Sequence, residues 1–163
     1  MPLELKELML RTPRLTLGVA ESLTCGWLQT RIGAVPGASE FFLGGLTAYA
    51  LDQKVRHLAV DRSVAAPVNS VSAEVAKQMA LGACAFFRSD IGLATTGYAE
   101  PSPSQGVGAP FAFWALAQVR AGSPAVVLGG RVDCPGLRRV EAQQRVADDV
   151  LKKLVTYLVR LRG

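Results

Sequence analysis

The sequence predicts an α/β domain whose mixed central sheet lies between two layers of helices. Short runs of β-forming residues alternate with helical patterns through the first part of the chain, which is typical of strand–helix units. Half of the 163 residues are hydrophobic and the mean hydropathy is +0.26, as expected for strands that are covered on both faces. Two strand-like runs joined by Ala121-Gly122-Ser123-Pro124 indicate an antiparallel hairpin near the end of the chain. Together these observations predict a three-layer α/β/α arrangement.

The first half of the chain is predicted to hold a lead helix and two strand–helix units. Leu15 to Ala20 alternates and is rich in β-formers, so we expect a buried strand, whereas Trp27 to Ile32 has a helical pattern. Proline and glycine interrupt the chain at Thr12-Pro13 and again before the second strand. The expected elements are a lead helix over residues 2–9, a strand ending at residue 20, a helix over 27–32, a loop over 33–38, a strand over 43–50 and a short helix to residue 58.

The second half is predicted to hold a long helix, a strand, the hairpin and a closing helix. Ser72 is expected to cap a helix that runs to Arg88, since Val75, Met79 and Ala83 recur at helical spacing. The other expected elements are a loop over residues 61–70, a buried strand over 90–95, a long loop over 96–108, hairpin strands over 109–119 and 125–132, and a helix over 136–161.

Length and composition indicate one soluble domain. We expect an N-terminal lead-helix segment over residues 1–12 and a single domain over 13–163. The charged N-terminus is unlike a signal peptide, and the longest uncharged run, Pro101 to Val119, contains prolines and serines that argue against a membrane span. The three scattered cysteines (Cys25, Cys84, Cys134) and the single histidine, His57, favour a reducing cytoplasm over a disulfide framework or a zinc site.

Three polar residues follow the first two predicted strands, at strand-to-helix turns. Ser22 comes directly after the first strand, and Tyr49 and Lys54 stand at the end of the second strand and in the helix that follows. A serine and a lysine without a usable histidine indicate acyl transfer by a serine whose base is a lysine. Each residue also has a structural interpretation: Ser22 as a helix cap, Tyr49 as a half-buried strand aromatic and Lys54 as a solvated charge.

Motifs along most of the chain from Thr16 onward resemble one family. Ala20-Glu21-Ser22-Leu23-Thr24-Cys25-Gly26 resembles A-E-S-x-T-G-G, and Pro36 to Lys54 resembles P-G-[SA]-S-x-x-F-x-G-G-x-x-[TA]-Y-S-N-x-x-K. Further matches are Val71 to Ala80 with V-S-x-x-V-A-x-x-M-A, Thr96 to Pro101 with T-G-I-A-G-P, and Gly106 to Gly108 with P-V-G-T. These are motifs of the CinA C-terminal domain family, which includes nicotinamide-nucleotide amidases.

The resemblance implies a site and a reaction. Ser22 would be the nucleophile, Lys54 its base and Tyr49 a proton relay, with backbone N–H groups near Thr24 and Cys25 as the oxyanion site. The substrate would be nicotinamide mononucleotide, which would be deamidated to nicotinic acid mononucleotide without a metal or an organic cofactor. The residues expected to hold the substrate are Thr24, Gly44, Gly45, Thr96, Gly97 and Arg139.

Several positions depart from the family pattern. A glycine after the nucleophile is replaced by Cys25, and the serine and asparagine after the tyrosine are replaced by Ala50 and Leu51. Glu100 stands where the T-G-I-A-G-P loop has its second glycine, and Gln143 stands where an arginine is expected. Because a carboxylate near a phosphate opposes its binding, we expect the nucleotide to be held more weakly than in relatives with the full loop, and the double change Glu100→Gly and Gln143→Arg to tighten it.

Two alternative functions stay open from the sequence. The departures would suit a relative that binds nucleotides but no longer turns them over. The net charge of +5 and the pI of 9.4 would suit a DNA-associated competence or repair accessory, although no nucleic-acid motif is present. Arg138, Arg139 and Arg145 near the C-terminus would attract an anion or simply form a solvated helix face. We expect a small-molecule nucleotide and no membrane as partners, with a homodimer as one option for the oligomeric state.

Overall fold

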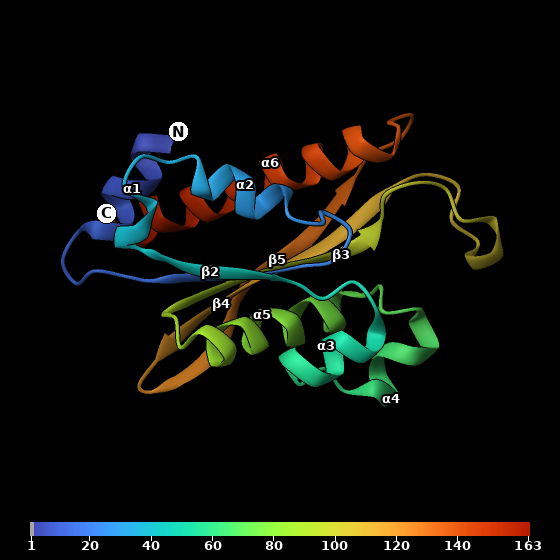
Figure 1. Cartoon of the computed structure of the whole chain (residues 1–163), viewed down its shortest axis with the longest axis horizontal. Helices are drawn as coiled ribbons and strands as arrows, with labels where there is room; N and C mark the ends of the chain where they lie inside the picture. The colour runs from blue at the N-terminus through green and yellow to red at the C-terminus, as the bar shows by residue number, and fades with distance from the viewer. Residues whose placement is uncertain (1) are drawn as a thin grey trace.

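The computed structural model describes residues 2–163 as a five-stranded sheet with helices on both faces (Figure 1). The strands are β1 (Leu17–Glu21), β2 (Phe42–Thr47), β3 (Ile91–Tyr98), β4 (Phe111–Arg120) and β5 (Ser123–Asp133). The helices are α1 (Pro2–Leu10), α2 (Trp27–Gly33), α3 (Leu51–Leu58), α4 (Arg62–Ala65), α5 (Ala73–Phe87) and α6 (Arg139–Arg162). Three short 3₁₀ turns, η1 (Ala38–Glu40), η2 (Ala66–Val68) and η3 (Pro103–Gln105), lie in the connections.

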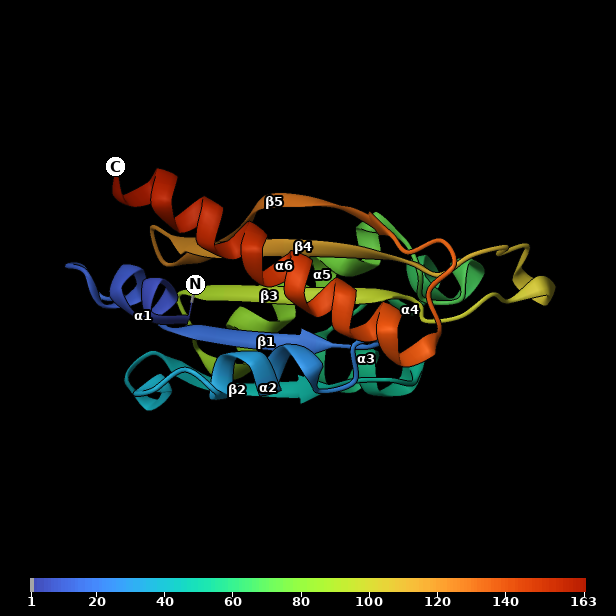
Figure 2. The ribbon, with the colours of Figure 1, turned by 90° about the horizontal axis from the view of Figure 1, so that it is seen from above.

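The sheet is mixed, as the sequence predicts. Its strand order is β2-β1-β3-β4-β5, and β1 pairs in parallel with both β2 and β3. β4 pairs antiparallel with β3 and with β5, so the predicted hairpin is confirmed. Figure 2 shows the strands side by side with α6 crossing one face. Because the three parallel strands point the same way, their carboxyl ends meet at one edge of the sheet.

The helices form two separate layers, which confirms the predicted α/β/α arrangement. α1, α2 and α6 cover one face of the sheet, and α3, α4 and α5 cover the other (Figure 1). Successive residues of a strand point to opposite faces, so Leu17 and Val19 of β1 enter the core on the α6 side, whereas Ala20 enters the core on the α5 side.

Small residues let α5 lie close against the sheet. A Cβ atom added at Gly18 would lie 2.7 Å from the Phe87 ring, and one added at Gly92 would lie 2.2 Å from the Ala80 carbonyl oxygen. Ala94 and Ala117 are fully buried on the same side. The close approach of α5 to the sheet therefore depends on these small residues, because larger side chains there would push the helix away.

Two strand ends and one loop differ from the sequence-based expectation. β2 ends at Thr47, opposite the last residue of β1, so Tyr49 lies beyond the strand. β3 continues to Tyr98 because β4 pairs with it along its whole length, so Thr96 and Gly97 belong to a strand and not to a loop. The segment over residues 61–70 contains α4 and η2, with the Asp61 side chain capping α4.

The two ends of the chain lie at the same end of the molecule (Figure 1). Leu5, Leu8 and Met9 of α1 are buried against the core that includes α6, so the lead helix packs with the rest of the chain. The Arg162 guanidinium donates to the carbonyl oxygens of Leu8 and Pro13 at 3.1 and 2.9 Å. A domain boundary after residue 12 remains a prediction. Over residues 2–163, every helix is too short or too polar to cross a bilayer.

Candidate active site

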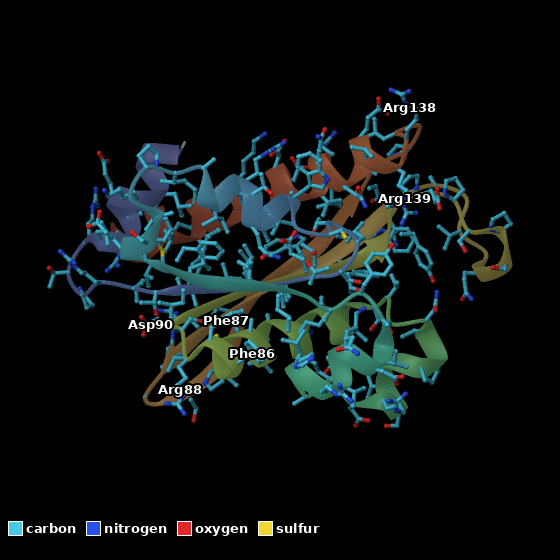
Figure 3. All side chains as sticks on the ribbon, in the orientation of Figure 1. Phe86, Phe87, Arg88, Asp90, Arg138 and Arg139 are labelled. Atoms are coloured by element: carbon cyan, nitrogen blue, oxygen red, sulfur yellow. The ribbon has the colours of Figure 1, made fainter. Side chains whose placement is uncertain are left out.

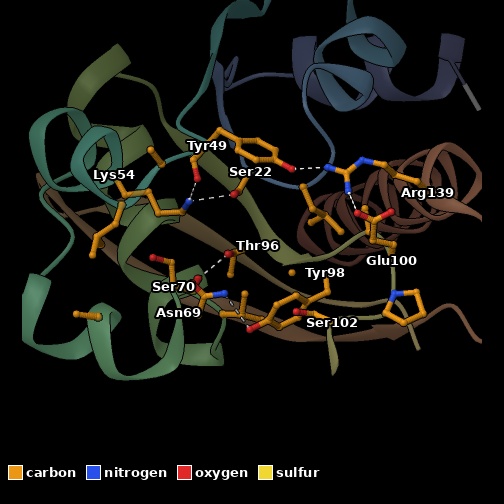
Figure 4. A pocket seen from close by; sticks show the side chains of 18 residues that line it. Ser22, Tyr49, Lys54, Asn69, Ser70, Thr96, Tyr98, Glu100, Ser102 and Arg139 are labelled. Carbon is orange, nitrogen blue, oxygen red and sulfur yellow. Dashed lines mark hydrogen bonds and ion pairs between the residues drawn. The ribbon is translucent and has the colours of Figure 1, made fainter. Parts of the chain in front are cut away.

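The carboxyl ends of β1, β2 and β3 surround a cavity of about 480 Å³ (Figure 4). Ser22 enters it directly after β1, Tyr49 and Lys54 enter it after β2, and Thr96 to Glu100 form its wall at the end of β3. The turn before α5 and the first residue of α6 complete the lining. This arrangement agrees with the expectation that a ligand site forms beyond the carboxyl ends of the parallel strands.

Ser22 and Lys54 are in direct contact. The Lys54 Nζ atom lies 3.0 Å from Ser22 Oγ and 2.7 Å from the Tyr49 carbonyl oxygen. Lys54 is 1% exposed and Ser22 is 7% exposed, so the pair lies at the floor of the cavity. The solvated-charge interpretation of Lys54 is therefore wrong, and a nucleophile and a base lie within hydrogen-bonding distance of each other.

Burial changes the acid–base behaviour of Lys54. Loss of solvent around the ammonium lowers its pKa from 10.5 to about 8. The two contacts that Lys54 makes are to a hydroxyl and to a carbonyl, and neither carries a charge that would hold the proton on the amine. At pH 7 about a tenth of the amine is therefore unprotonated and able to accept the Ser22 proton, and this fraction rises to about half near pH 8.

The turn after β1 holds Ser22 without using it as a helix cap. The residue before α2 is Gly26, and the buried Glu21 carboxylate accepts hydrogen bonds from the Leu28 and Gln29 amides at 2.8 and 3.0 Å. The Glu21 side chain thus accepts hydrogen bonds from free N–H groups at the start of α2, which is the role of a capping serine. The Ser22 amide donates to the Thr95 carbonyl at 3.1 Å, which ties the turn to β3.

The two positions that are glycine in the family motif at this turn have a left-handed backbone conformation. Gly26 has φ +94°, and Cys25 has φ +44° where the family has glycine. A side chain at positive φ is unfavourable by about 1 kcal/mol, so Cys25 holds the turn under strain. Its amide, which we expected to face an oxyanion, donates instead to the Ser22 carbonyl at 3.1 Å.

Tyr49 contributes to the site through two different groups. Its carbonyl oxygen accepts a hydrogen bond from Lys54, while its hydroxyl accepts one from Arg139 Nη2 at 2.6 Å. The side chain is 51% exposed and lies beyond the end of β2, so the aromatic is half-buried as interpreted but does not belong to a strand. Among the described residues the hydroxyl is bonded to Arg139 and not to Ser22 or Lys54, so a role as proton relay would require the ring to turn.

Arg139 lines the cavity and is already paired. Its Nη1 atom lies 2.7 Å from Glu100 Oε1, and both side chains are about half exposed. Figure 3 shows Arg138 pointing outward and Arg139 lying beside the loop that follows β3. Arg138 forms an ion pair with Glu141, and Arg145 forms one with Asp149. Of these three arginines, only Arg139 lines the cavity.

The predicted substrate-binding residues divide into two groups. Thr96, Gly97 and Arg139 line the cavity. Thr24 is fully buried with its hydroxyl bonded to that of Thr95, and Gly44 and Gly45 lie on β2, where an added Cβ would meet Phe87 and Gln29. These three residues do not line the cavity, since they serve packing. Gln143 is buried one turn along α6 from Arg139 and is also absent from the lining, so it is not in contact with the expected phosphate position.

A polar wall opposite Arg139 contains four residues that were not predicted. Asn69, Ser70, Tyr98 and Ser102 form it together with the predicted Thr96 (Figure 4). Thr96 Oγ1 donates to the Ser70 carbonyl at 2.6 Å, and Asn69 Nδ2 donates to the Tyr98 hydroxyl at 3.3 Å. Asn69 and Ser70 both have positive φ, at 50° and 61°. Consecutive left-handed residues at a cavity are a strained arrangement, and nothing in the sequence besides the asparagine indicated it.

Metal ligands and a catalytic histidine are not part of this site. The described residues contain no cluster of three or more histidine, cysteine, aspartate or glutamate side chains that would hold a metal ion. His57 accepts or donates a hydrogen bond with Gln53 on α3 at 3.0 Å and packs edge-on against Phe86. It does not line the cavity, in keeping with the predicted surface histidine.

Comparison with known proteins identifies the family to which this arrangement belongs. The model of the CinA C-terminal domain matches residues 4–158, which is nearly the whole chain and includes every residue of the cavity. The chain belongs to the CinA C-terminal domain family. The crystal structure of a CinA superfamily protein from Enterobacter cloacae has the same fold, with a TM-score of 0.85, 25% identity and coverage of 96% of this chain and 89% of that one.

Curated CinA-like proteins are more similar in sequence but much longer. One from Geobacter metallireducens is 43% identical over 106 residues, which are 63% of this chain and 26% of that protein. One from Citrifermentans bemidjiense is 43% identical over 119 residues, or 71% of this chain and 28% of that protein. The chain thus spans about a quarter of the length of the curated relatives that it matches.

Proposed function

We propose that the protein hydrolyses a primary carboxamide and releases ammonia, with Ser22 as nucleophile and Lys54 as general base. The observation that carries the proposal is the 3.0 Å contact between Ser22 Oγ and a lysine amine whose pKa burial lowers to about 8. A serine hydroxyl is a weak nucleophile by itself, and a neutral amine at hydrogen-bonding distance is able to accept its proton.

The proposed reaction proceeds in two halves. Ser22 Oγ attacks the carboxamide carbon while its proton passes to Lys54 Nζ, giving a tetrahedral intermediate. Lys54 returns the proton to the amide nitrogen, which leaves as ammonia and gives an ester on Ser22. A water molecule then attacks the ester carbon, again losing a proton to Lys54, and the carboxylic acid departs as Ser22 takes the proton back.

Backbone N–H groups near Thr24 would stabilise the oxyanion in the proposed intermediate. The Cys25 amide is bonded to the Ser22 carbonyl, so it would have to change partner to take part. Tyr49 would hold Lys54 through its carbonyl oxygen, and its hydroxyl would join the proton transfer only after leaving Arg139. Neither a metal nor an organic cofactor has a part in these steps.

The family resemblance implies nicotinamide mononucleotide as the substrate, and it is therefore the first carboxamide to test. A cavity of about 480 Å³ is in the range of small-molecule sites, and it combines a nucleophile at the floor with hydroxyls on one wall. Thr96, Gly97 and Arg139 would contact the nucleotide. The cytoplasmic location and a homodimer remain predictions that accompany this function.

Release of ammonia from nicotinamide mononucleotide by the purified protein tests the proposal. The Ser22→Ala variant should lose at least about a thousandfold in kcat while its thermal midpoint stays close to that of the wild type, because Ser22 does not cap α2. Ser123→Ala, at the exposed first residue of β5, is the matched control and should keep its activity.

Two results would contradict the proposal. Activity that survives in Ser22→Ala would exclude Ser22 as nucleophile. A wild type that binds the nucleotide and releases no ammonia would favour the alternative of a relative that binds without turnover.

A further inference from the structure

The cavity contains few charges for a site that would receive a nucleotide. Of its lining residues, Lys54, Glu100 and Arg139 carry formal charges. The Lys54 amine is committed to Ser22 and to the Tyr49 carbonyl at the floor. Arg139, whose side chain is 44% exposed, is therefore the lining cation that remains to meet an anionic group of a ligand.

Glu100 already forms an ion pair with Arg139. Its Oε1 atom lies 2.7 Å from Arg139 Nη1, while Arg139 Nη2 donates to the Tyr49 hydroxyl at 2.6 Å (Figure 4). A phosphate that approaches Arg139 must displace the Glu100 carboxylate or lie beside it. The pair is exposed enough to separate easily, but the carboxylate remains attached to the loop after β3, within the ~8 Å over which charges act in physiological salt.

The opposite wall offers neutral groups. Asn69, Ser70, Tyr98 and Ser102 present an amide and hydroxyls to the cavity, and their neighbouring bonds leave further donor and acceptor positions free. Groups of this kind pair well with sugar hydroxyls. A ligand that carries hydroxyls and no phosphate would use this wall without opposing Glu100.

We infer that Glu100 sets the substrate class of this site, favouring carboxamides that carry neutral hydroxyl groups over those that carry a phosphate. The inference rests on the proposed amidase function and concerns which carboxamide is held best. Glu100 acts as an internal competitor for Arg139, so that a phosphorylated ligand binds only against a carboxylate that a neutral ligand leaves in position.

Calorimetry in a Ser22→Ala background, where the ligand is not consumed, tests this inference. The probes are nicotinamide mononucleotide and the corresponding ribonucleoside, which has the same carboxamide and sugar but no phosphate. We expect the ribonucleoside to bind at least about threefold more tightly than the nucleotide, and Glu100→Gln to lower the nucleotide Kd about tenfold while the ribonucleoside Kd changes by less than about twofold. The gain for the nucleotide should shrink as salt is raised.

Asp149→Asn is the matched control, because it removes the same charge from an ion pair with Arg145 on α6, away from the cavity lining. It should leave both dissociation constants unchanged. The inference is overturned if Glu100→Gln leaves the nucleotide Kd unchanged, if both ligands gain equally, or if neither ligand binds. The proposed function fails in a different way, when the wild type binds a ligand and releases no ammonia from it.

Discussion

Lys54 is a lysine in an environment that differs strongly from water. It is 1% exposed, yet neither of its hydrogen-bond partners is charged. A surface lysine would be protonated at every physiological pH and would be unable to act as a base, whereas burial lowers the pKa of Lys54 to about 8. The catalytic proposal therefore depends on the desolvation of one amine.

The pH dependence of turnover should report this pKa. We expect kcat/KM to rise with pH through an apparent pKa of about 8, because the neutral amine is the active form. Lys54→Arg should remain inactive across the whole range, since a guanidinium keeps its proton. The measurement is ammonia release between pH 6 and 10, and an arginine variant with near wild-type turnover would remove Lys54 from the mechanism.

At this scale the sequence predicted the central pair and three further residues that line the cavity, Thr96, Gly97 and Arg139, but it missed other parts of the lining. Ser22 and Lys54 were identified because their types and motif positions indicate chemistry. Gly44 and Gly45 were misassigned, because the sequence does not show whether a glycine makes room for a ligand or for a neighbouring side chain of the protein. The Asn69–Ser70 turn was missed because its part in the cavity depends on β3, which lies more than twenty residues further along the chain.

Among the secondary-structure elements, α3 has the most direct effect on the site, because it carries Lys54. Its C-terminal end lies against α5 at Gly82, where an added Cβ would be 2.2 Å from the Leu58 carbonyl oxygen. That oxygen belongs to the helix backbone and cannot turn away as a side chain would. The contact therefore fixes how closely α3 approaches α5, and with it the position of the Lys54 amine.

Gly82→Ala should affect both stability and activity. The added methyl group must displace α3, so we expect a loss of about 1–3 kcal/mol in the free energy of unfolding and a fall in kcat, because Lys54 moves relative to Ser22. Gly33→Ala in α2 is the control: open space surrounds that position, and the change should be neutral or stabilising. Urea denaturation and ammonia release measure the two effects, and an active, fully stable Gly82→Ala variant would contradict this account of α3.

The element boundaries show where local sequence information ends. The order and type of the main helices and strands follow from periodicity and from turn residues. The ends of β2 and β3 do not, because β2 stops where its partner β1 stops and β3 continues as far as β4 pairs with it. Strand length is thus decided by neighbours distant in sequence, and for that reason Tyr49 and Thr96 were each assigned to the wrong kind of segment.

For the molecule as a whole, the burial of Lys54 makes stability depend on pH. In the unfolded chain this amine has its ordinary pKa near 10.5, whereas in the folded protein the pKa is about 8. Between these values the unfolded state binds more protons, so the contribution of Lys54 to the free energy of unfolding rises with pH. Burial of Cys84 raises its pKa to about 11 and acts in the opposite sense above pH 9.

A comparison of two lysine variants isolates the contribution of Lys54 to the pH dependence of stability. In Lys54→Met the rise between pH 8 and 10 should disappear, and the variant should be more stable than the wild type by about 1–3 kcal/mol near pH 7, after allowing for the donor lost to the Tyr49 carbonyl. Lys77→Met, at an exposed position of α5, should leave the pH profile unchanged. Chemical denaturation across this pH range gives both profiles, and parallel curves for wild type and Lys54→Met would show that the amine is not desolvated.

The common location of the two chain ends has a practical consequence for protein engineering. Arg162 joins the last helix to Leu8 and Pro13, and this region lies at the opposite end of the sheet from the cavity (Figure 1). A reporter or an affinity tag fused at either terminus would therefore leave the cavity uncovered. A peptide linker between the termini would also permit a circular permutant with new ends at the exposed Ala121–Gly122 turn, because the original ends lie at the same end of the molecule (Figure 1).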